Sequence, residues 1–594
     1  MSGVTTKGIK LGTSIKDGLL AIEGSVELSV DRYISLRALL DTVNETPGHY
    51  VKVDDETYVE ISSELKSQLQ KLRALTVDGK KDTLLAHPLS AQALENLMGE
   101  VECSFTDDVR KIIEKRDEAM ALDVQVPKTL TADLRPYQKD GFSWLYRLSS
   151  WGVGACLADD MGLGKTIQTI ALILKLCKNG PSMIVCPTSL GANWAKEFSR
   201  FAPTLTVKRL KESDKRNETI EGMKANEVLI VSYGLFVNES ESLFKTTWET
   251  VVYDEAQSLK NSMTQRAKTA VKINSKMSIA LTGTPIENNL DDLWSIFNII
   301  NPGLLGTVRQ FRSRFANASS DKNAARILKL IISPFIMRRL KNDVLDDLPS
   351  RTEQVITVEP SEREAELYEA LRLKTLDDLE KESLPKDKSG QRRLQILSAL
   401  TRIRQFCCDP ALISEDLGTS AVSSKSEAFC DLLDEALSGG HRVLVFSQFV
   451  GYLIKVREIL DKKQISYQYL DGQTPEKKRA EAVDSFQSGE GDVFLISLKA
   501  GGQGLNLTGA DYVMHLDPWW NPAVEDQATD RAYRIGQTRP VNVFRFVMKD
   551  SIEEKILELH AKKREISATF LSGTSEVAAE AMKLSEEELL NLLS

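Results

Sequence analysis

Residues 159–166 read DDMGLGKT and lie between two apolar stretches, GACLA before them and IQTIALILKL after them. An apolar run, a glycine-containing turn that ends in Gly-Lys-Thr, and then a helix form the layout of a phosphate-binding loop. In that layout Lys165 reaches the terminal phosphates and the Thr166 hydroxyl ligates Mg²⁺. The general pattern has glycine five places before Gly164, where this chain has Asp159. By itself the stretch is therefore equally consistent with a glycine-rich turn between core elements.

Two adjacent carboxylates, Asp254 and Glu255, directly follow the apolar stretch TVVY. Two further apolar runs, MIVC and VLIV, lie between the phosphate loop and this pair, and we expect all three to be strands ending at one edge of a parallel sheet. There Asp254 would hold Mg²⁺ while Glu255 orients and deprotonates the attacking water. A lone Asp-Glu pair is common by chance, but this order after a phosphate loop favours nucleotide hydrolysis. The next strand, MSIAL, ends in Thr282, Gly283 and Thr284, which suit sensing of a γ-phosphate.

A third group of candidate residues lies near the C-terminal end, in EDQATDRAYRIGQT. Gln527, Arg531 and Arg534 stand at i, i+4 and i+7, which predicts that they share one face of a helix. Basic helical stripes are commonly solvated surface. Because a second α/β unit starts near Lys425, after the phosphate-loop unit, we interpret the two arginines as arginine fingers at the interface between lobes, which contribute about 10³ to 10⁵ in turnover. Gln138, on an aromatic helix before the phosphate loop, could contact an adenine edge, although a lone helical glutamine is usually surface.

Composition bounds these interpretations. A chain of 594 residues is too long for one core, and 42% hydrophobic with 27% charged residues is typical of globular domains. The net charge of -9 does not signal a nucleic-acid partner, so any basic surface must be local. For the local basic clusters, ion pairs with neighbouring acids are as good an interpretation as phosphate contacts. These clusters are Arg338, Arg339, Lys341, Arg402 and Arg404.

The seven cysteines form no CxxC pair and the histidines do not cluster. This argues against structural zinc and for a reducing compartment. The N-terminal stretch lacks an apolar signal core, and no apolar run reaches the roughly 18 to 20 residues that span a bilayer. We expect no membrane association and an intracellular location, cytoplasmic or nucleoid in a bacterium and nuclear in a eukaryote.

The order of these patterns predicts five regions. YVKV and TYVEI near the start predict a hairpin, and SSELKSQLQKLRAL predicts a capped amphipathic helix. Between about residues 290 and 415 the pattern is helical. The predicted regions are an α+β accessory region (1–125), a first α/β lobe with a helical protrusion after residue 290 (126–345), a helical protrusion or linker (346–420), a second lobe (421–560), and a C-terminal helical brace or tail (561–594).

From about Leu134 to Glu553 the chain resembles the SWI/SNF-type ATPases, which are double-stranded-DNA translocases of helicase superfamily two. Several of the matching segments are weak alone, but ten in the family's order are specific. The family replaces the early glycine of the phosphate loop, which accounts for Asp159. Two departures are DEAQ in place of DEAH or DEGH, which leaves any cross-lobe hydrogen bond to Gln257, and Tyr533 where histidine is frequent. The accessory region is most similar to the segment preceding the ATPase in bacterial members. The matching segments are LRPYQKDG, DDMGLGKT, CPTSLGANWAKEF, VSYG, DEAQ, LTGTPIENN, VLVFSQF, SLKAGGQGLNLTGADYV, DPWWNP and DQATDRAYRIGQT.

The resemblance implies two RecA-like lobes with helical protrusions, ATP and Mg²⁺ held between them, and double-stranded DNA across the cleft. The implied DNA contacts include hydroxyl residues and two tryptophans, which are named below. The alternative role of each hydroxyl is to cap a helix, and the alternative role of the tryptophans is to pack under the arginines. The implied ATP-binding residues are Gln138, Asp160, Met161, Gly162, Leu163, Gly164, Lys165 and Thr166. The implied catalytic residues are Lys165, Glu255, Arg531 and Arg534, and the implied metal ligands are Thr166 and Asp254. The implied DNA-binding residues are Thr188, Ser189, Tyr233, Ser447, Lys499, Gly501, Trp519 and Trp520.

The implied activity is ATP-driven movement along intact duplex DNA by a monomer that remodels or displaces DNA-bound proteins without separating the strands. One alternative is an ATPase that associates with RNA polymerase and recycles it. Another is a regulatory scaffold that binds ATP and DNA without using the cycle. The complete set of Lys165, Asp254, Glu255 and the two arginines argues against a scaffold, which has no need of it.

Overall fold

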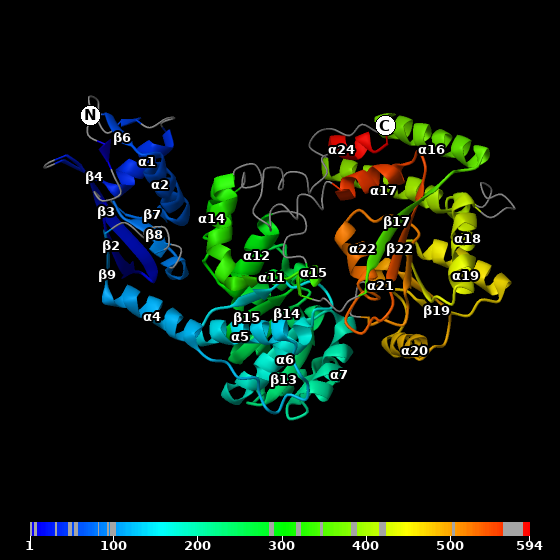
Figure 1. Cartoon of the computed structure of the whole chain (residues 1–594), viewed down its shortest axis with the longest axis horizontal. Coiled ribbons are helices and arrows are strands. Elements are labelled where there is room, and N and C mark those ends of the chain that lie inside the picture. Colours follow the sequence, from blue (N-terminus) through cyan, green and yellow to red (C-terminus); the bar gives the residue numbers. More distant parts are fainter. Residues whose placement is uncertain are drawn as a thin grey trace.

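The computed structural model has three parts that follow one another along the chain (Figure 1). The N-terminal region lies on the side of the first lobe that faces away from the second lobe. No helix that the structure describes is long and apolar enough to cross a membrane. The structure describes residues 3–4, 9–29, 32–45, 50–52, 58–80, 82–91, 94–95, 102–283, 290–315, 322–344, 349–381, 389–414, 423–501, 505–561 and 586–593.

The N-terminal region is a small α+β unit, as predicted. Strands β5 and β6 pair antiparallel as the expected hairpin. The expected capped helix is α2, whose Leu65 N–H donates to Ser62 Oγ at 3.1 Å. Helix α2 packs against α14 of the first lobe and α4 against α5. The strands are β1 (Gly3–Val4), β2 (Ile9–Lys16), β3 (Leu19–Ser29), β4 (Arg32–Ser35), β5 (Tyr50–Lys52), β6 (Tyr58–Ile61), β7 (Val77–Asp78), β8 (Leu84–Ala86) and β9 (Glu102–Phe105), and the helices are α1 (Leu36–Glu45), α2 (Ser63–Leu75) and α4 (Asp107–Ala121).

Lobe one is built on a seven-stranded sheet in the order β12-β13-β11-β14-β15-β10-β16, with every pair parallel. Its central strands are continuous apolar runs because helices cover both faces of a parallel sheet. The strands are β10 (Ala155–Leu157), β11 (Ser182–Cys186), β12 (Thr206–Arg209), β13 (Glu227–Ser232), β14 (Trp248–Asp254), β15 (Ser275–Leu281) and β16 (Ile336–Met337). The helices are α5 (Pro136–Trp151), α6 (Lys165–Leu176), α7 (Gly191–Phe201), α8 (Arg216–Glu221), α9 (Tyr233–Asn238), α10 (Ser240–Lys245) and α11 (Gln265–Lys272).

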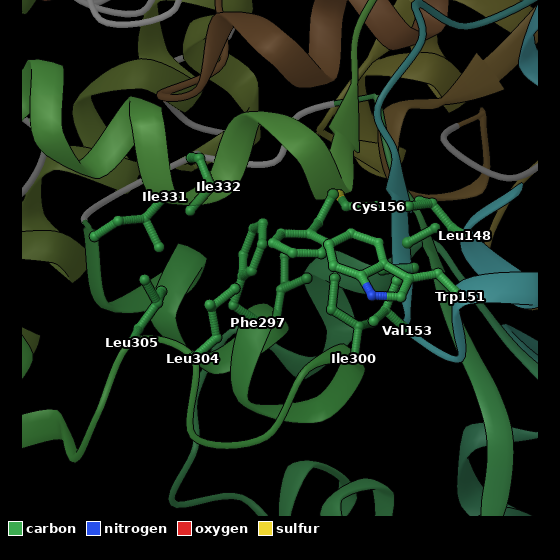
Figure 2. Close-up of a cluster of buried hydrophobic side chains, with 14 of the residues drawn as sticks. Leu148, Trp151, Val153, Cys156, Phe297, Ile300, Leu304, Leu305, Ile331 and Ile332 are labelled. Atoms are coloured by element: carbon green, nitrogen blue, oxygen red, sulfur yellow. The ribbon is translucent and has the colours of Figure 1, made fainter. Parts of the chain in front are cut away.

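A helical insertion follows β15 and returns the chain to the same sheet through β16. Its helices are α12 (Leu290–Ile300), α13 (Val308–Phe315) and α14 (Lys322–Ile332). Figure 2 shows side chains of the insertion, among them Phe297 and Ile300, packed against Trp151 and Val153 at the end of α5. The insertion therefore shares its core with lobe one rather than forming a separate unit.

Lobe two is built on a second parallel sheet, in the order β17-β22-β21-β18-β20-β19. The predicted fold class of two α/β lobes with helical protrusions is thus confirmed. The strands are β17 (Arg351–Val358), β18 (Val443–Ser447), β19 (Tyr467–Leu470), β20 (Val493–Ser497), β21 (Tyr512–His515) and β22 (Val541–Met548). The helices are α15 (Lys341–Val344) between the lobes, and then α16 (Glu362–Lys381), α17 (Ser389–Cys408), α18 (Ser424–Ser438), α19 (Val450–Lys463), α20 (Glu476–Gln487), α21 (Leu498–Gly501) and α22 (Pro522–Thr529).

Strand β17 corrects the prediction that the chain between about residues 290 and 415 is helical throughout. Its sequence, RTEQVITV, is largely exposed, because it forms an edge of the sheet and pairs only with β22 among the described strands. An exposed edge strand lacks the continuous apolar run that marks a buried one. The sheet of lobe two therefore begins before the helices α16 and α17 and resumes after them.

The described part of the predicted C-terminal brace lies against the helices of lobe two. Residue 561 ends a helical stretch that begins at residue 552 in lobe two, and α24 (Glu586–Asn591) packs on α17. Arg372 of α16 donates to the Leu593 carbonyl at 2.7 Å. Leu589 and Leu592 share a buried cluster with Ile396 and Leu400 of α17. These contacts attach the C-terminal helix to the protrusion of lobe two.

Candidate active site

The predicted phosphate loop, residues 159–166, joins β10 to α6. Gly162 and Gly164 have φ of 83° and 81°, a left-handed conformation that favours glycine. The loop therefore turns sharply into the first residues of α6, where free backbone N–H groups can bind an anion. Lys165 Nζ donates to the carbonyls of Asp159 at 2.5 Å and Asp160 at 3.3 Å, which places the ammonium at the loop.

Asp159, at the position where the general pattern has glycine, is fully buried and ion-paired with Arg339. Arg339 Nε donates to Asp159 Oδ1 at 3.0 Å, and its Nη2 donates to Gln168 Oε1 at 2.8 Å. Arg339 Nη1 also donates to the Tyr137 carbonyl. This guanidinium thus ties the phosphate loop to α5 and α6. The basic cluster in the sequence contained Arg339 but did not reveal this role, because only the structure shows that the Asp159 carboxylate is buried and requires a cation.

Gln138 lies on α5 directly beside the phosphate loop. Its Oε1 accepts from Arg135 N at 3.0 Å, and its Nε2 donates to the Leu163 carbonyl at 3.1 Å. The Tyr137 hydroxyl donates to the same carbonyl at 3.1 Å. Gln138 is only 6% exposed, so it ties the loop to α5 in this structure, and its contact with adenine stays a prediction.

The acid pair, Asp254 and Glu255, stands at the carboxyl end of β14, next to the phosphate loop. Trp194 Nε1 donates to Asp254 Oδ2 at 2.8 Å, and Glu255 N donates to Asp254 Oδ1 at 3.0 Å. Burial, and then the neighbouring Glu255 charge, raise the pKa of Asp254 to about 7. Glu255 has φ of 50°, a left-handed conformation that is uncommon for residues other than glycine and recurs at active sites. Trp194, which the sequence did not single out, orients the predicted metal ligand.

Gln257 connects the acid pair to the end of β15. Its Nε2 donates to Glu255 Oε2 at 2.7 Å, and its Oε1 accepts from Thr282 Oγ1 at 3.3 Å. Both partners belong to lobe one. The bond from lobe two comes instead from Gln527, whose Nε2 donates to Glu255 Oε1 at 3.4 Å. Thr284, which the sequence predicted to sense a γ-phosphate, lies outside the described residues.

The two candidate arginines do not lie on a helix, which corrects the prediction from their spacing. Helix α22 ends at Thr529, and residues 530–534, which we call the arginine segment, form turns. The turns are held by partners distant in the chain: Leu507 N donates to the Arg531 carbonyl at 3.0 Å, and Lys341 Nζ donates to the Tyr533 carbonyl at 2.6 Å. Carbonyls with such partners are not available to the next helical turn.

Tertiary contacts nonetheless bring both arginines to lobe one. Arg531 is 4% exposed, and burial lowers its pKa to about 10 while the Glu255 charge counteracts the shift. A Cβ built on Gly162 would stand 2.9 Å from Arg534 Cβ, so the phosphate loop touches the arginine segment. Among the described residues, Arg531 Nε and Nη2 and Arg534 Nε have no hydrogen-bond partner. Arg534 Nη1 donates to the Leu505 carbonyl at 3.4 Å. Buried donors without partners are rare in proteins, and two guanidinium groups with such donors can bind an anion.

The predicted DNA contacts divide into surface and interior residues. Thr188 is exposed and Ser189 half-buried in a 3-10 turn (Thr188–Leu190) that follows β11. Lys499 is exposed on α21, which follows β20 and ends at Gly501. These positions lie at the carboxyl ends of strands in both lobes.

The other predicted DNA contacts point into the protein. The Tyr233 hydroxyl donates to the Asp254 carbonyl at 2.9 Å and the side chain is 3% exposed. Ser447 is fully buried and its Oγ donates to Asp517. The ring of Trp520 lies 4.9 Å from the Arg404 guanidinium and that of Trp519 lies 6.0 Å from it, and both rings are half-buried.

The donor set at the acid pair fits Mg²⁺. Mg²⁺ takes oxygen ligands and is commonly held by one or two carboxylates together with substrate phosphates. Asp254 offers a carboxylate, and the half-buried Thr166 offers a hydroxyl at the start of α6. Within the described residues there is no group of three or more His, Cys, Asp or Glu that could hold a metal by itself. A divalent ion here would complete its coordination with water and phosphate oxygens.

Residues 137–412 match the family model described as SNF2-related domain, and residues 424–536 match the helicase conserved C-terminal domain. The Sulfolobus solfataricus SWI2/SNF2 ATPase core, solved in complex with dsDNA, is 36% identical, with 79% of this chain and 99% of that chain covered and a TM-score of 0.38. The chain belongs to the SWI2/SNF2 family. The predicted resemblance is therefore confirmed.

Bacterial and eukaryotic proteins are also similar to this chain. The putative ATP-dependent helicase/translocase YwqA of Bacillus subtilis is 37% identical over 83% of this chain and 54% of its own length. An uncharacterized ATP-dependent helicase of Mycoplasma pneumoniae is 34% identical over 92% of this chain and 53% of its own length. The SWI/SNF-related matrix-associated actin-dependent regulator of chromatin subfamily A member 1 of Mus musculus is 34% identical over 77% of this chain and 45% of its own length. The chain thus spans about half the length of the curated relatives it matches.

Proposed function

We propose that the protein is a DNA-dependent ATPase that moves along double-stranded DNA and displaces or remodels proteins bound to it, without separating the strands. The observation that carries ATP hydrolysis is the pair of buried arginines of lobe two. Their guanidinium groups have donors without partners among the described residues, and they lie against the phosphate loop and the acid pair of lobe one. A nucleotide bound between the lobes would present its terminal phosphate to all three groups.

In this proposal each residue has a separate role. Lys165 and the backbone N–H groups at the start of α6 hold the terminal phosphates. Thr166 and Asp254 hold Mg²⁺, which when bound neutralises charge on the phosphates. Glu255, whose carboxylate accepts from Gln257 and Gln527, orients and deprotonates the attacking water. The two arginines stabilise the charge that develops on the transferred phosphoryl group.

Two observations support a duplex DNA track. The archaeal core, 36% identical to this chain, was solved in complex with dsDNA. The exposed Thr188 and Lys499 follow β11 in lobe one and β20 in lobe two, so each lobe presents an accessible polar side chain at the carboxyl end of a strand. We propose that the track crosses these two positions together with Ser189 and Gly501. Tyr233 and Ser447 would then act by supporting Asp254 and Asp517. Trp519 and Trp520 would act by packing around the Arg404 guanidinium.

The first test is steady-state ATP hydrolysis at low salt with no nucleic acid, single-stranded DNA, double-stranded DNA or structured RNA. A Glu255→Gln variant serves as the blank, because it should bind ATP without turning it over. Stimulation chiefly by duplex DNA supports the proposal. Equal rates in all four conditions count against a DNA track, and normal multiple turnover by Glu255→Gln refutes the assigned role of Glu255.

Movement and strand separation need a second test. Displacement of a third strand from a triplex reports travel along an intact duplex, and release of one strand from a duplex reports unwinding. The proposal requires ATP-dependent triplex displacement without unwinding.

The salt dependence of binding is a further test of the track. If the protein contacts roughly six to ten phosphates, its affinity for duplex DNA should fall about 10³- to 10⁵-fold between 50 and 200 mM salt. A nearly flat salt response contradicts such a track.

A further inference from the structure

Lys341 occupies the segment that joins the two lobes. It begins α15, which follows β16, the last strand of lobe one, and precedes β17, the first strand of lobe two. Its side chain is 5% exposed. A lysine buried in a connection between lobes must have partners that compensate for the loss of water.

The partners of Lys341 come from both lobes. Its backbone N–H donates to Asp160 Oδ2 of the phosphate loop at 3.1 Å. Its Nζ donates to Asp530 Oδ1 at 2.5 Å and to the Tyr533 carbonyl at 2.6 Å. The ammonium also lies 5.0 Å from the centre of the Tyr533 ring. A Cβ built on Gly162 would stand 3.6 Å from Lys341 Cε, so the lysine stem passes directly over the phosphate loop.

The two residues that Lys341 Nζ holds directly precede Arg531 and Arg534 in the chain. Because the arginine segment is a series of turns and not a helix, no helical ladder of hydrogen bonds fixes these two arginines. Arg351 supports the same carboxylate less closely, with its Nη1 3.8 Å from Asp530 Oδ1. Leu507 N, which donates to the Arg531 carbonyl at 3.0 Å, and Gln537 Nε2, which donates to the Ala532 carbonyl at 3.2 Å, hold the segment from within lobe two. Lys341 ties the same segment to the connection between the lobes.

Asp530 and Lys341 also compensate each other electrostatically. Burial raises the pKa of Asp530, and the charge of Lys341 counteracts that shift. Burial lowers the pKa of Lys341, and Asp530 counteracts it. Removal of the lysine would take away the nearest cation of a buried carboxylate and leave it, among the described residues, with the more distant Arg351 and the charges of Arg531 and Arg534, so we expect the segment to move toward water.

We propose that Lys341 is a positioning residue that fixes the two arginines against the phosphate loop and thereby sets the rate of ATP hydrolysis without contacting ATP. This inference rests on the proposed function. It means that the segment connecting the lobes helps to align Arg531 and Arg534 with the phosphate loop. A misplacement of about 1 Å far from the chemistry can cost about 10²-fold in rate, and we expect a loss of this size.

The test replaces Lys341 by methionine, which keeps the length of the stem and removes the donor. The dissociation constant for ATP should change by less than about threefold, while kcat falls about 10²-fold, because only alignment in the transition state is lost. Lys425→Met is the matched control. Lys425 is 2% exposed and pairs with Glu553 within lobe two, so its loss tests for the general effect of breaking a buried lysine pair. Its kcat per folded molecule should remain that of the unmodified protein.

A double variant separates positioning from general instability. In an Arg534→Ala background, single-turnover hydrolysis should fall little further when Lys341→Met is added, because residues that act as a unit are not additive. A full additional 10²-fold loss, an unchanged kcat in Lys341→Met, or an equal loss in Lys425→Met would each overturn the inference.

Hydrogen exchange keeps the inference distinct from the proposed function. Without nucleotide, amides of residues 529–537 should exchange faster in Lys341→Met than in the unmodified protein, with no such change in Lys425→Met. If the unmodified protein hydrolyses no ATP under any condition, the proposed function fails. Faster exchange then still supports the holding role of Lys341, and unchanged exchange overturns it.

Discussion

Replacement of Asp159 by glycine is a sharp test of the phosphate loop, because pattern and structure predict opposite results. The substitution restores the general phosphate-loop sequence, so the pattern predicts a neutral or favourable change. In the structure Asp159 is fully buried and the side chain of Arg339 is 15% exposed. Removal of one partner of a buried ion pair costs about 3–5 kcal/mol. Because Arg339 keeps some contact with water and its bonds to Gln168 and the Tyr137 carbonyl, we expect the lower end, about 3 kcal/mol.

The assay is urea unfolding of lobe one, followed by tryptophan fluorescence, since Trp151 and Trp194 are buried there. Asp214→Gly, at an exposed position of the same lobe, controls for the flexibility of glycine and should cost no more than about 1 kcal/mol. The double variant Asp159→Gly, Arg339→Met should lose about 2 kcal/mol less unfolding free energy than the sum of the losses in the two single variants, because it leaves no unpaired buried charge. A free energy of unfolding for Asp159→Gly equal to that of the unmodified protein would refute the structural role of this pair.

Three further predictions concern the lobes and the track. Arg534→Ala should bind ATP with little change while turnover falls about 10³-fold, and an unchanged single-turnover rate would remove its role as an arginine finger. Glu476 of lobe two accepts from Arg209 and Lys211 of lobe one, both at 2.7 Å. Glu476→Gln should remove at most about 1 kcal/mol, because this contact between the lobes is part-exposed. The distance between the lobes, measured by fluorescence transfer at low salt, should then increase, and an unchanged distance would contradict a link between the lobes. Lys499→Ala should weaken duplex binding for all sequences and reduce the salt slope by about 1, and a binding isotherm and slope identical to those of the unmodified protein would exclude a phosphate contact there.

Local patterns predicted the interior of the first sheet well. The runs MIVC, VLIV and TVVY lie on β11, β13 and β14 because strands buried on both faces must be continuously apolar. The position of the acid pair followed for the same reason, since the polar residues after such a strand reach the edge of the sheet. Strand β17 was missed because an exposed edge strand carries polar residues, and its partner β22 lies far along the chain.

In the arginine segment, by contrast, the local pattern predicted the wrong secondary structure. Spacing at i, i+4 and i+7 has the period of a helix, yet α22 ends before Arg531. The deciding contacts come from Lys341 and Leu507. Periodicity within a short window carries no information about partners so distant in the chain. The role of Arg339 escaped the sequence for the same reason, since its carboxylate partner precedes it by most of lobe one.

The sequence by itself determined which chemical groups the protein contains and their order along the chain: a phosphate loop, an acid pair and two arginines near the C-terminal end. Burial of apolar runs and the direction of parallel strands are sufficient to place such groups at sheet edges. Only the tertiary structure decided how the groups meet. It paired Asp159 with Arg339, turned Gln257 toward lobe one, and brought Gln527 and the arginines across from lobe two. These contacts depend on how distant segments pack within lobe one and on how the two sheets lie against each other, and the local sequence pattern of either sheet does not contain that geometry.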